Sequence, residues 1–249
     1  MTKKEMLENL FGVEKPTIGM IHLAGETREE IIKRTFEELE IYQDEGVNGA
    51  IIEDYHGTTE DMIKVLGRIS EKDYEIIIGT NVLQNPYSCF PFTRFFGGKF
   101  VQLDSVQTQD LGLDLKHYEN LRIAYQDIFV FGGVGFKYKD PTGNPLEIDL
   151  EAAKSRCDAI VTTGEGTGVE TPIEKLREYR ETLDTLGFED FPLIIGAGVN
   201  PDNAYEQLMI ADGVITGSAF KPNGNTELPV DRSKVKSLMD IVREIRKIP

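Results

Sequence analysis

Short runs rich in Ile and Val alternate with longer charged segments along this 249-residue chain, and the alternation repeats eight times. Most of the runs are apolar throughout, which is typical of parallel strands that are covered on both faces. The expected strands are Thr17–Leu23, Gly49–Glu53, Glu75–Gly79, Phe100–Leu103, Asp127–Phe131, Ala159–Thr162, Pro192–Gly196 and Gly213–Gly217.

The segments between the runs carry helix signals. Apolar residues recur at helical spacing between Arg28 and Glu45, and Gly46 follows as a stop. The expected helices are Arg28–Glu45, Thr59–Ile69 behind a Thr58 cap, one opened by Thr171-Pro172 and running to Leu186, one opened by Asn200-Pro201, and one from the Asp231 cap to Lys247. Repeated strand–helix alternation implies a parallel sheet with right-handed crossovers, and eight units predict a closed (β/α)8 TIM barrel.

The alternative architecture is an open, doubly wound sheet. That fold usually carries GxGxxG after its first strand, whereas the first run here ends His22-Leu23-Ala24-Gly25. Barrels of about 250 residues commonly form one unit. No Pro-, Ser- or charge-rich linker divides the chain, so we expect one domain over residues 1–249.

The formal net charge of −16 repels nucleic acid and anionic membrane surfaces, so we expect neither as a partner. No apolar run approaches the roughly 20 residues that span a bilayer, and we expect no membrane insertion. Cys89 and Cys157 lack a CxxC partner, and Met1–Glu5 does not resemble a signal peptide. We therefore expect a cytoplasmic protein without a cofactor, and Cys157 as a buried small hydrophobe.

Two consecutive strands are expected to end in glycine-rich segments. The seventh runs into Gly196-Ala197-Gly198 and the eighth into Gly217-Ser218. Glycines let a phosphate reach backbone N–H groups, and Ser218 adds a hydroxyl donor. We predict a phosphate site formed by Gly196, Gly198, Gly217 and Ser218, in the loops after strands seven and eight. Alternatively, these glycines only make tight turns.

Polar residues follow the other strands, at the end of the barrel where this fold carries its chemistry. The candidate catalytic residues are His22, Glu53, Asp54, Asn81, Asp104 and Lys137. Lys137 has three interpretations: a cation paired with Asp104 or with a substrate anion, a solvated surface residue, or a Schiff-base nucleophile.

Glu53 and Asp54 are neighbours on a strand and face opposite ways, so one of them faces the barrel mouth. Its role would be that of a general base or of a salt-bridge partner, and Asp104 has the same two interpretations. His22 is either catalytic or structural. A divalent metal held by Glu53, Asp54 and Asp104 is a further option, but no ligand spacing supports it and we assign no metal site.

The segment 163–170 is rich in Gly and Thr. It predicts a lid that closes over a ligand through Thr163, Gly166, Thr167 and Gly168, the alternative being a flexible loop without a role. A second unusual segment is aromatic, with Phe90, Phe92, Phe95, Phe96 and Phe100. Most of these rings are expected to pack a helix on the barrel, and exposed ones would indicate self-association into a homo-oligomer.

Several of these segments together resemble the BtpA/SgcQ family over essentially the whole chain. The segments are Ile18–Leu23, Asn81–Asn85, Thr167-Gly168, Gly196–Pro201, Asp212–Lys221 and Pro229–Asp231. The resemblance implies a TIM-barrel enzyme, with Glu53-Asp54 matching an acidic pair after strand two and Lys137 a lysine after strand five. Relatives carry photosystem I biogenesis and phosphoribosylanthranilate isomerase-like labels. Two departures are Ala24-Gly25-Glu26 in place of a proline-rich stretch, and Tyr138 in place of an expected His.

Three functions follow as hypotheses. The first is an isomerase acting on a phosphorylated sugar or similar phosphoester, in which a carboxylate moves a proton and Lys137 stabilises the developing enolate. The second is aldol cleavage through Lys137. The third is a non-catalytic assembly factor that retains a phosphate pocket.

Overall fold

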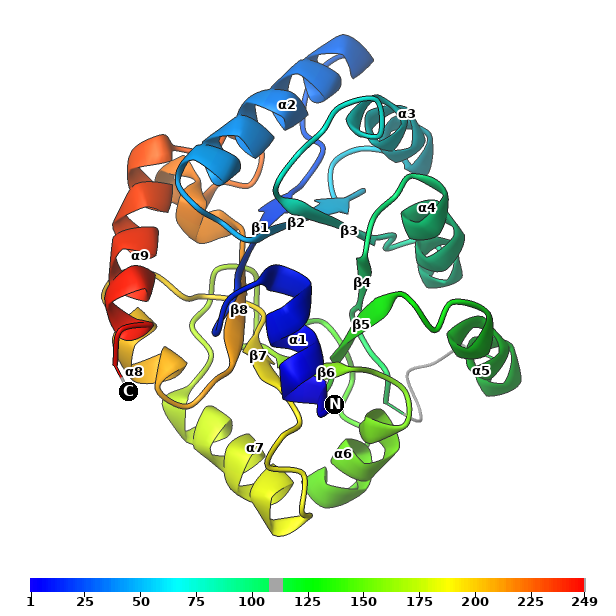
Figure 1. Cartoon of the computed structure of the whole chain (residues 1–249), viewed down its shortest axis with the longest axis vertical. Coiled ribbons are helices and arrows are strands. Elements are labelled where there is room, and N and C mark those ends of the chain that lie inside the picture. The colour runs from blue at the N-terminus through cyan, green and yellow to red at the C-terminus, as the bar shows by residue number, and fades with distance from the viewer. Residues whose placement is uncertain (108–113, 249) are drawn as a thin grey trace.

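The structure is a computed structural model that describes residues 1–107 and 114–248. Each strand pairs in parallel with the next along the chain, and the last pairs with the first, which closes a barrel (Figure 1). The strands are β1 Thr17–Ile21, β2 Gly49–Glu53, β3 Ile77–Asn81, β4 Phe100–Leu103, β5 Phe129–Gly133, β6 Ala159–Thr162, β7 Leu193–Ile195 and β8 Gly213–Thr216. The predicted (β/α)8 fold is confirmed.

The helices are α1 Lys3–Phe11, α2 Arg28–Asp44, α3 Thr59–Ile69, α4 Cys89–Phe95, α5 Leu115–Ala124, α6 Leu146–Lys154, α7 Ile173–Thr185, α8 Ala204–Leu208 and α9 Arg232–Ile245, with short 3-10 turns η1 Pro86–Ser88, η2 Ser218–Phe220 and η3 Pro222–Gly224. All of the helices except α1 form a ring around the barrel (Figure 1). The predicted caps are present, since Thr58 accepts from the Asp61 N–H and Asp231 accepts from the Ser233 N–H.

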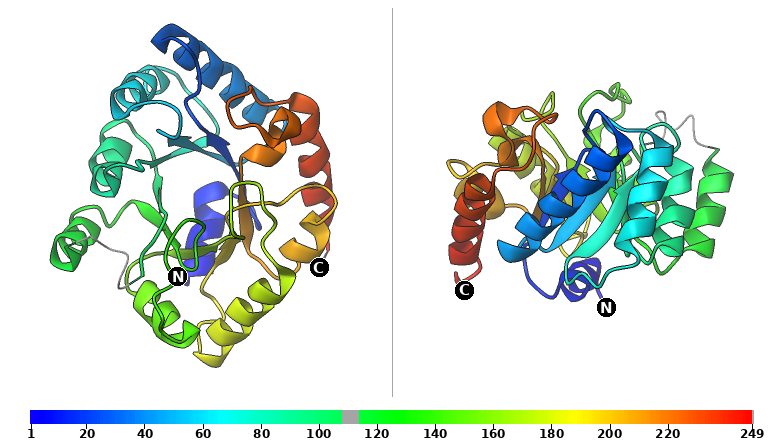
Figure 2. Two further views of the ribbon diagram at one scale, coloured as in Figure 1. Left: turned by 180° about the vertical axis from the view of Figure 1, so that it is seen from behind. Right: turned by 90° about the horizontal axis from the view of Figure 1, so that it is seen from above.

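The helix α1 was not expected from the sequence. It closes the end of the barrel where the strands begin, opposite the loops that follow the strands (Figure 2). Its Phe11 ring packs against Phe100 and Phe131 inside the barrel, with centroids 5.5 and 6.3 Å apart. A capping box of Thr2 and Glu5 starts the helix, and this pattern is visible in the sequence.

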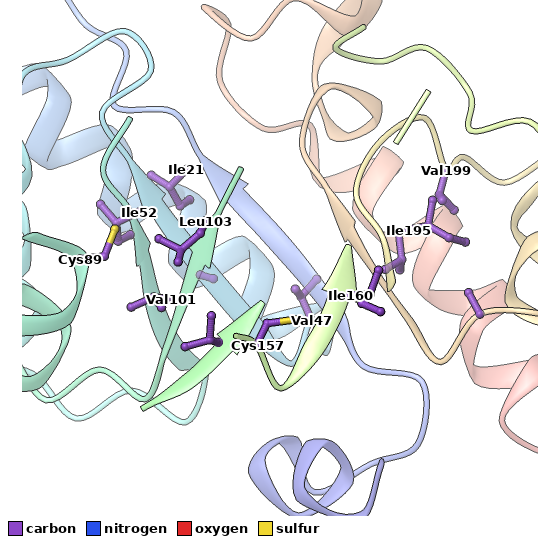
Figure 3. Close-up of a cluster of buried hydrophobic side chains, with 14 of the residues drawn as sticks. Ile21, Val47, Ile52, Cys89, Val101, Leu103, Cys157, Ile160, Ile195 and Val199 are labelled. Carbon is purple, nitrogen blue, oxygen red and sulfur yellow. The ribbon is translucent and has the colours of Figure 1, made fainter. Parts of the chain in front are cut away.

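The side chains of each strand alternate between the barrel interior and the layer under the helices. The interior cluster contains Ile18, Ile51 and Phe100. Figure 3 shows part of the outer layer, in which Ile52 of β2, Val101 of β4 and Cys89 of α4 are drawn. Both cysteines are buried and free, as expected for Cys157.

Two strands lie two residues later than predicted. Glu75–Gly79 is corrected to Ile77–Asn81, and Asp127–Phe131 to Phe129–Gly133. Both strands contain glycines that packing inside the sheet requires. A Cβ on Gly79 would lie 2.3 Å from the Phe100 ring, so only glycine leaves room for that ring.

The phenylalanine-rich segment contains both buried and exposed rings. Phe90 and Phe100 are fully buried, whereas Phe95, the last residue of α4, is 81% exposed. One exposed ring does not establish an interface, and self-association stays a prediction.

A buried ion pair connects α2 to the loop that follows β8. Lys221 Nζ donates to Glu38 Oε1 over 2.6 Å, and neither side chain reaches solvent. The same oxygen accepts from Arg34 Nε and from the N–H of Val230. Burial lowers the pKa of Lys221, and the charge of Glu38 opposes that shift. The pair therefore holds the loop after Gly217 and Ser218 against α2.

Replacing Glu38 with Gln should destabilise the protein by about 3–5 kcal/mol, because it leaves the Lys221 ammonium buried without its counter-charge. The measurement is the free energy of unfolding in urea. Glu37→Gln is the matched control on the same helix, since Glu37 is exposed and forms an ion pair with the exposed Lys33. Equal stability of the two variants would contradict the role given to the buried pair.

Candidate active site

The carboxyl ends of the strands surround a cavity of about 130 Å³, at the end of the barrel opposite α1. Strand residues two positions apart share a face. Because Ile51 and Met20 belong to the interior cluster, Glu53 and His22 also point inward. Glu53, His22 and Asp104 all line this cavity, which we call the mouth.

An amide links two carboxyl groups in the mouth. Asn81 Nδ2 donates to Glu53 Oε1 over 2.8 Å and to Asp104 Oδ1 over 3.0 Å. Burial raises the pKa of Glu53 to about 8, and the charge of Asp104 adds to this effect. Lys137 and the bond from Asn81 act in the opposite direction. Glu53 can therefore gain and lose a proton near neutral pH.

Asp54 points away from the mouth. Its Oδ1 accepts from the Leu83 N–H over 2.8 Å, and its Oδ2 accepts from the Thr59 hydroxyl over 3.1 Å. These bonds fasten the start of α3 and the loop after β3. The geometry thus settles which of the acidic pair faces the mouth, and it gives Asp54 a structural role.

His22 lies beside Glu53, with 3.9 Å between Nε2 and Glu53 Oε2. Burial lowers the pKa of His22 well below its ordinary value, and the charge of Lys221 contributes further. The ring is therefore neutral at pH 7. Its Nδ1 is buried and has no hydrogen-bond partner within the described part of the chain.

Lys137 extends from the loop after β5 and lines the mouth. The backbone N–H of Lys137 donates to Thr163 Oγ1 over 2.6 Å, which fixes the backbone of the loop. Lys175 of α7 supports this arrangement from behind, since its Nζ donates to the carbonyls of Gly135 and Thr163. Among residues 1–107 and 114–248, Lys137 Nζ makes no hydrogen bond and no ion pair, so its N–H groups can reach a ligand.

The predicted lid has a fixed base and an outer part. Thr163 is fully buried at the end of β6. Thr167 and Gly168 line the mouth, where the Thr167 N–H donates to Tyr138 Oη over 3.0 Å. Gly166 lies next to Tyr138, because a Cβ there would be 3.4 Å from the same hydroxyl. Tyr138 and Thr167 thus join the loops after β5 and β6 across the mouth.

The glycines after β7 and β8 line the mouth together with Ser218. A Cβ on Gly217 would lie 2.7 Å from His22 Cε1, and one on Gly196 would lie 2.6 Å from Val161 Cγ1. Gly198 has φ +77°, a conformation that favours glycine. Packing alone therefore requires these glycines, and phosphate binding stays a prediction.

Gln102 and Tyr138 also line the mouth and were not among the site residues predicted from the sequence. Gln102 lies two positions before Asp104 on β4, donates to Asp104 Oδ1 over 3.3 Å, and leaves its buried Oε1 without a partner among the described residues. The two-residue strand period identifies it once Asp104 is placed inward. Tyr138 has φ +60°, and no sequence signal indicated that its ring would cover the mouth.

The metal site considered from the sequence does not form, because Asp54 faces away from Glu53 and Asp104. Within the ranges described, no three His, Cys, Asp or Glu side chains gather closely enough to hold a metal ion. In the same ranges, none of the helices combines the length and the apolar character that a bilayer-spanning segment needs.

A closed parallel barrel with an acid–amide–acid cluster and a lysine at its carboxyl end defines a protein of the TIM-barrel class. The profile of the BtpA family matches residues 13–244, and the chain belongs to the BtpA family. It is 25% identical to the photosystem I biogenesis protein BtpA of Synechocystis, covering 94% of this chain and 90% of that one. It is 24% identical to the putative sgc region protein SgcQ of Escherichia coli, covering 97% and 99%.

Solved structures with the same fold include two enzymes. Thiamine phosphate pyrophosphorylase from Pyrococcus furiosus superposes with a TM-score of 0.63 at 18% identity, covering 96% of this chain and 98% of that one. Phosphoribosyl anthranilate isomerase from Thermococcus kodakaraensis superposes with a TM-score of 0.58 at 18% identity, covering 93% and 99%. These likenesses concern the fold.

The raised pKa of Glu53 predicts how stability depends on pH. The folded protein holds the Glu53 proton up to about pH 8, whereas the unfolded chain releases it near 4.5. Stability therefore falls as pH rises between these values, by about 1.4 kcal/mol per pH unit for one fully linked proton. Glu53→Gln should remove this part of the decrease in the free energy of unfolding, measured in urea between pH 5 and 8.

Glu29→Gln provides the control, because Glu29 is exposed on α2. It should reproduce the pH profile of the unchanged protein. Identical profiles for Glu53→Gln and the unchanged protein would show that Glu53 does not hold its proton in the folded state.

Proposed function

We propose that this protein is an enzyme that isomerises a phosphorylated sugar or a similar small phosphoester by acid–base proton transfer. The observation that carries the proposal is Glu53, a buried carboxyl group with a pKa of about 8 in the same cavity as Lys137. An acid–base catalyst works best when its pKa lies near the pH at which it operates.

The mouth supplies the other groups that such a reaction needs. When Glu53 takes a proton from the carbon beside a carbonyl, negative charge develops on the carbonyl oxygen. Lys137 Nζ is positioned to stabilise this charge, since it has no partner among the described residues. The neutral His22 ring can donate a hydrogen bond to the same or a neighbouring substrate oxygen.

The loops after β7 and β8 are the proposed grip for the phosphate. In the described part of the chain, the N–H groups of Gly198 and Ser218 donate no hydrogen bond, and both residues line the mouth. The Ser218 hydroxyl adds a further donor. Backbone donors suit an anion in a chain whose net charge of −16 would otherwise repel it.

The names of two barrels of the same fold mention phosphorylated compounds, namely thiamine phosphate and phosphoribosyl anthranilate. This agrees with the proposed substrate class. The proposal itself rests on the residues of this chain, because many unrelated reactions occur on this fold.

Isomerisation can be tested by hydrogen exchange in D2O with a panel of aldose and ketose phosphates. The unchanged protein should introduce deuterium next to the carbonyl of its substrate. Glu53→Gln should slow this exchange by about 10²–10⁴-fold, the usual contribution of a general acid–base group. Glu29→Gln should leave it unchanged.

Absence of exchange with every compound would contradict the isomerase proposal. Trapping of a covalent adduct at Lys137 by borohydride would instead favour the aldolase, since only a Schiff base is reduced in that way.

The anion site can be tested by thermal shift with the same compounds and their phosphate-free counterparts. A ligand at 100 times its Kd adds about 2.7 kcal/mol of stability. Gly217→Val should abolish the shift, because the added carbons collide with His22. Ser218→Ala, which preserves the backbone, should weaken binding by about 0.5–1.5 kcal/mol. Equal shifts from phosphate-free sugars would contradict an anion site.

A second candidate is a non-catalytic assembly factor. The name of the Synechocystis relative and the exposed Phe95 ring favour it. If this candidate is correct, the function of the protein survives substitution of Lys137 or Asp104 by alanine. The same function is lost when the surface around Phe95 is changed.

A further inference from the structure

We propose that the ligand of this barrel is a phosphodiester whose second half is a hydroxyl-rich group, held across two neighbouring hollows. The inference rests on the anion site of the proposed function and specifies the substrate class of that site. It starts from Thr167, Gly168, Gly198 and Ser218, which line both the mouth and a second hollow. We call these four residues the shared wall.

The second hollow, called here the outer groove, has a volume of about 820 Å³. Beyond the shared wall its lining includes Asn200, Asp202, Asn223, Ser233, Lys234 and Ser237. It lies between the loop after β8 and the start of α9, which are adjacent in Figure 2. The mouth alone, at about 130 Å³, is smaller than the roughly 300–1,000 Å³ of ordinary ligand sites. A ligand anchored at the shared wall therefore has room mainly on its outer side.

Two of the four residues of the shared wall are glycines, which keeps it thin. Gly168 and Gly198 have φ +75° and +77°, and a Cβ on Gly168 would lie 2.8 Å from Ser218 Oγ. A Cβ on Gly198 would lie 2.4 Å from Glu170 Cα, so a side chain at either glycine would displace residues around the two hollows. The phosphorus of a diester is tetrahedral, so its two ester oxygens leave in different directions. One substituent can then enter the mouth and the other the outer groove.

The charges favour a diester over a monoester. All four residues of the shared wall are neutral, and the donors that they offer are N–H and hydroxyl groups, apart from the Thr167 N–H, which donates to Tyr138 Oη. Lys137 lies on the mouth side. The groove side is lined by Lys221, whose charge is already paired with Glu38, and by Lys234 and Asp202, which carry opposite charges. A phosphomonoester carries a charge of about −1.5 to −2 at pH 7, whereas a diester carries a single charge. The single charge suits neutral donors in a chain of net charge −16.

The lining of the outer groove indicates the chemistry of the second half. Its described lining contains amide, hydroxyl, carboxyl and ammonium groups, and neither an aromatic ring nor a large aliphatic side chain. Such a surface offers hydrogen bonds but no platform for a nucleobase or an acyl chain. A glycerol or sugar unit fits it.

The test compares glycerol 3-phosphate with bis(glyceryl) phosphate, its diester analogue, by calorimetric titration of the full chain. The diester should bind about tenfold more tightly, which corresponds to about 1.4 kcal/mol. Ser237→Trp should abolish this preference, because the ring fills the outer groove, and should leave monoester binding unchanged. Lys236→Trp is the matched control, since Lys236 is one residue away on α9 and pairs with Asp240 outside the groove.

Diester binding no tighter than monoester binding would overturn the proposal and leave the anion site intact. A preference that persists in Ser237→Trp would overturn it as well. If neither compound binds to the unchanged protein, while the phosphosugars of the panel do shift its melting temperature, the diester inference fails and the proposed function stands. If nothing phosphorylated binds, both fail together.

Discussion

Closure of eight parallel strands imposes the constraint on which the rest of this structure depends. A closed barrel gives every strand one inner and one outer face, and successive side chains must alternate between them. The inner positions Ile51 and Met20 therefore place Glu53 and His22 in the mouth, while Asp54 points to the outer layer. The same alternation places Gly217 inward after Ile215, where a side chain would strike His22.

Burial at these positions determines which protonation state each side chain favours. Glu53 and His22 are both buried in the same cavity, and burial favours the neutral form of each. The pKa of Glu53 rises to about 8, whereas that of His22 falls well below its ordinary value. Lys137, anchored through its backbone to Thr163, brings a positive charge to the same space. A protein that is strongly acidic overall thus has in its mouth a carboxyl group that can hold a proton, and a cation.

Stability and site are coupled through the loop after β8. Glu38 and Lys221 form an ion pair without solvent contact, which costs desolvation energy that its hydrogen bonds must offset. The pair connects α2, at the beginning of the chain, to the segment that follows Gly217 and Ser218. The backbone of the shared wall is therefore held by contacts that lie outside the mouth, while Tyr138 and Thr167 join the loops on its other side.

The sequence alone determined the barrel, the inner polar ring and the glycine-rich ends of strands seven and eight, because strand and helix periods and turn residues are local properties. It placed β3 and β5 two residues too early, and both strands contain glycines that make room for residues from other segments, the Phe100 ring at Gly79 and the Cys157 Cβ at Gly132. Only the tertiary structure decided that Glu53 rather than Asp54 faces the mouth, that Gln102 and Tyr138 belong to it, and that a groove continues beyond Ser218. These features depend on side chains from distant segments meeting in space, and on the burial of charge that follows, which no local pattern encodes.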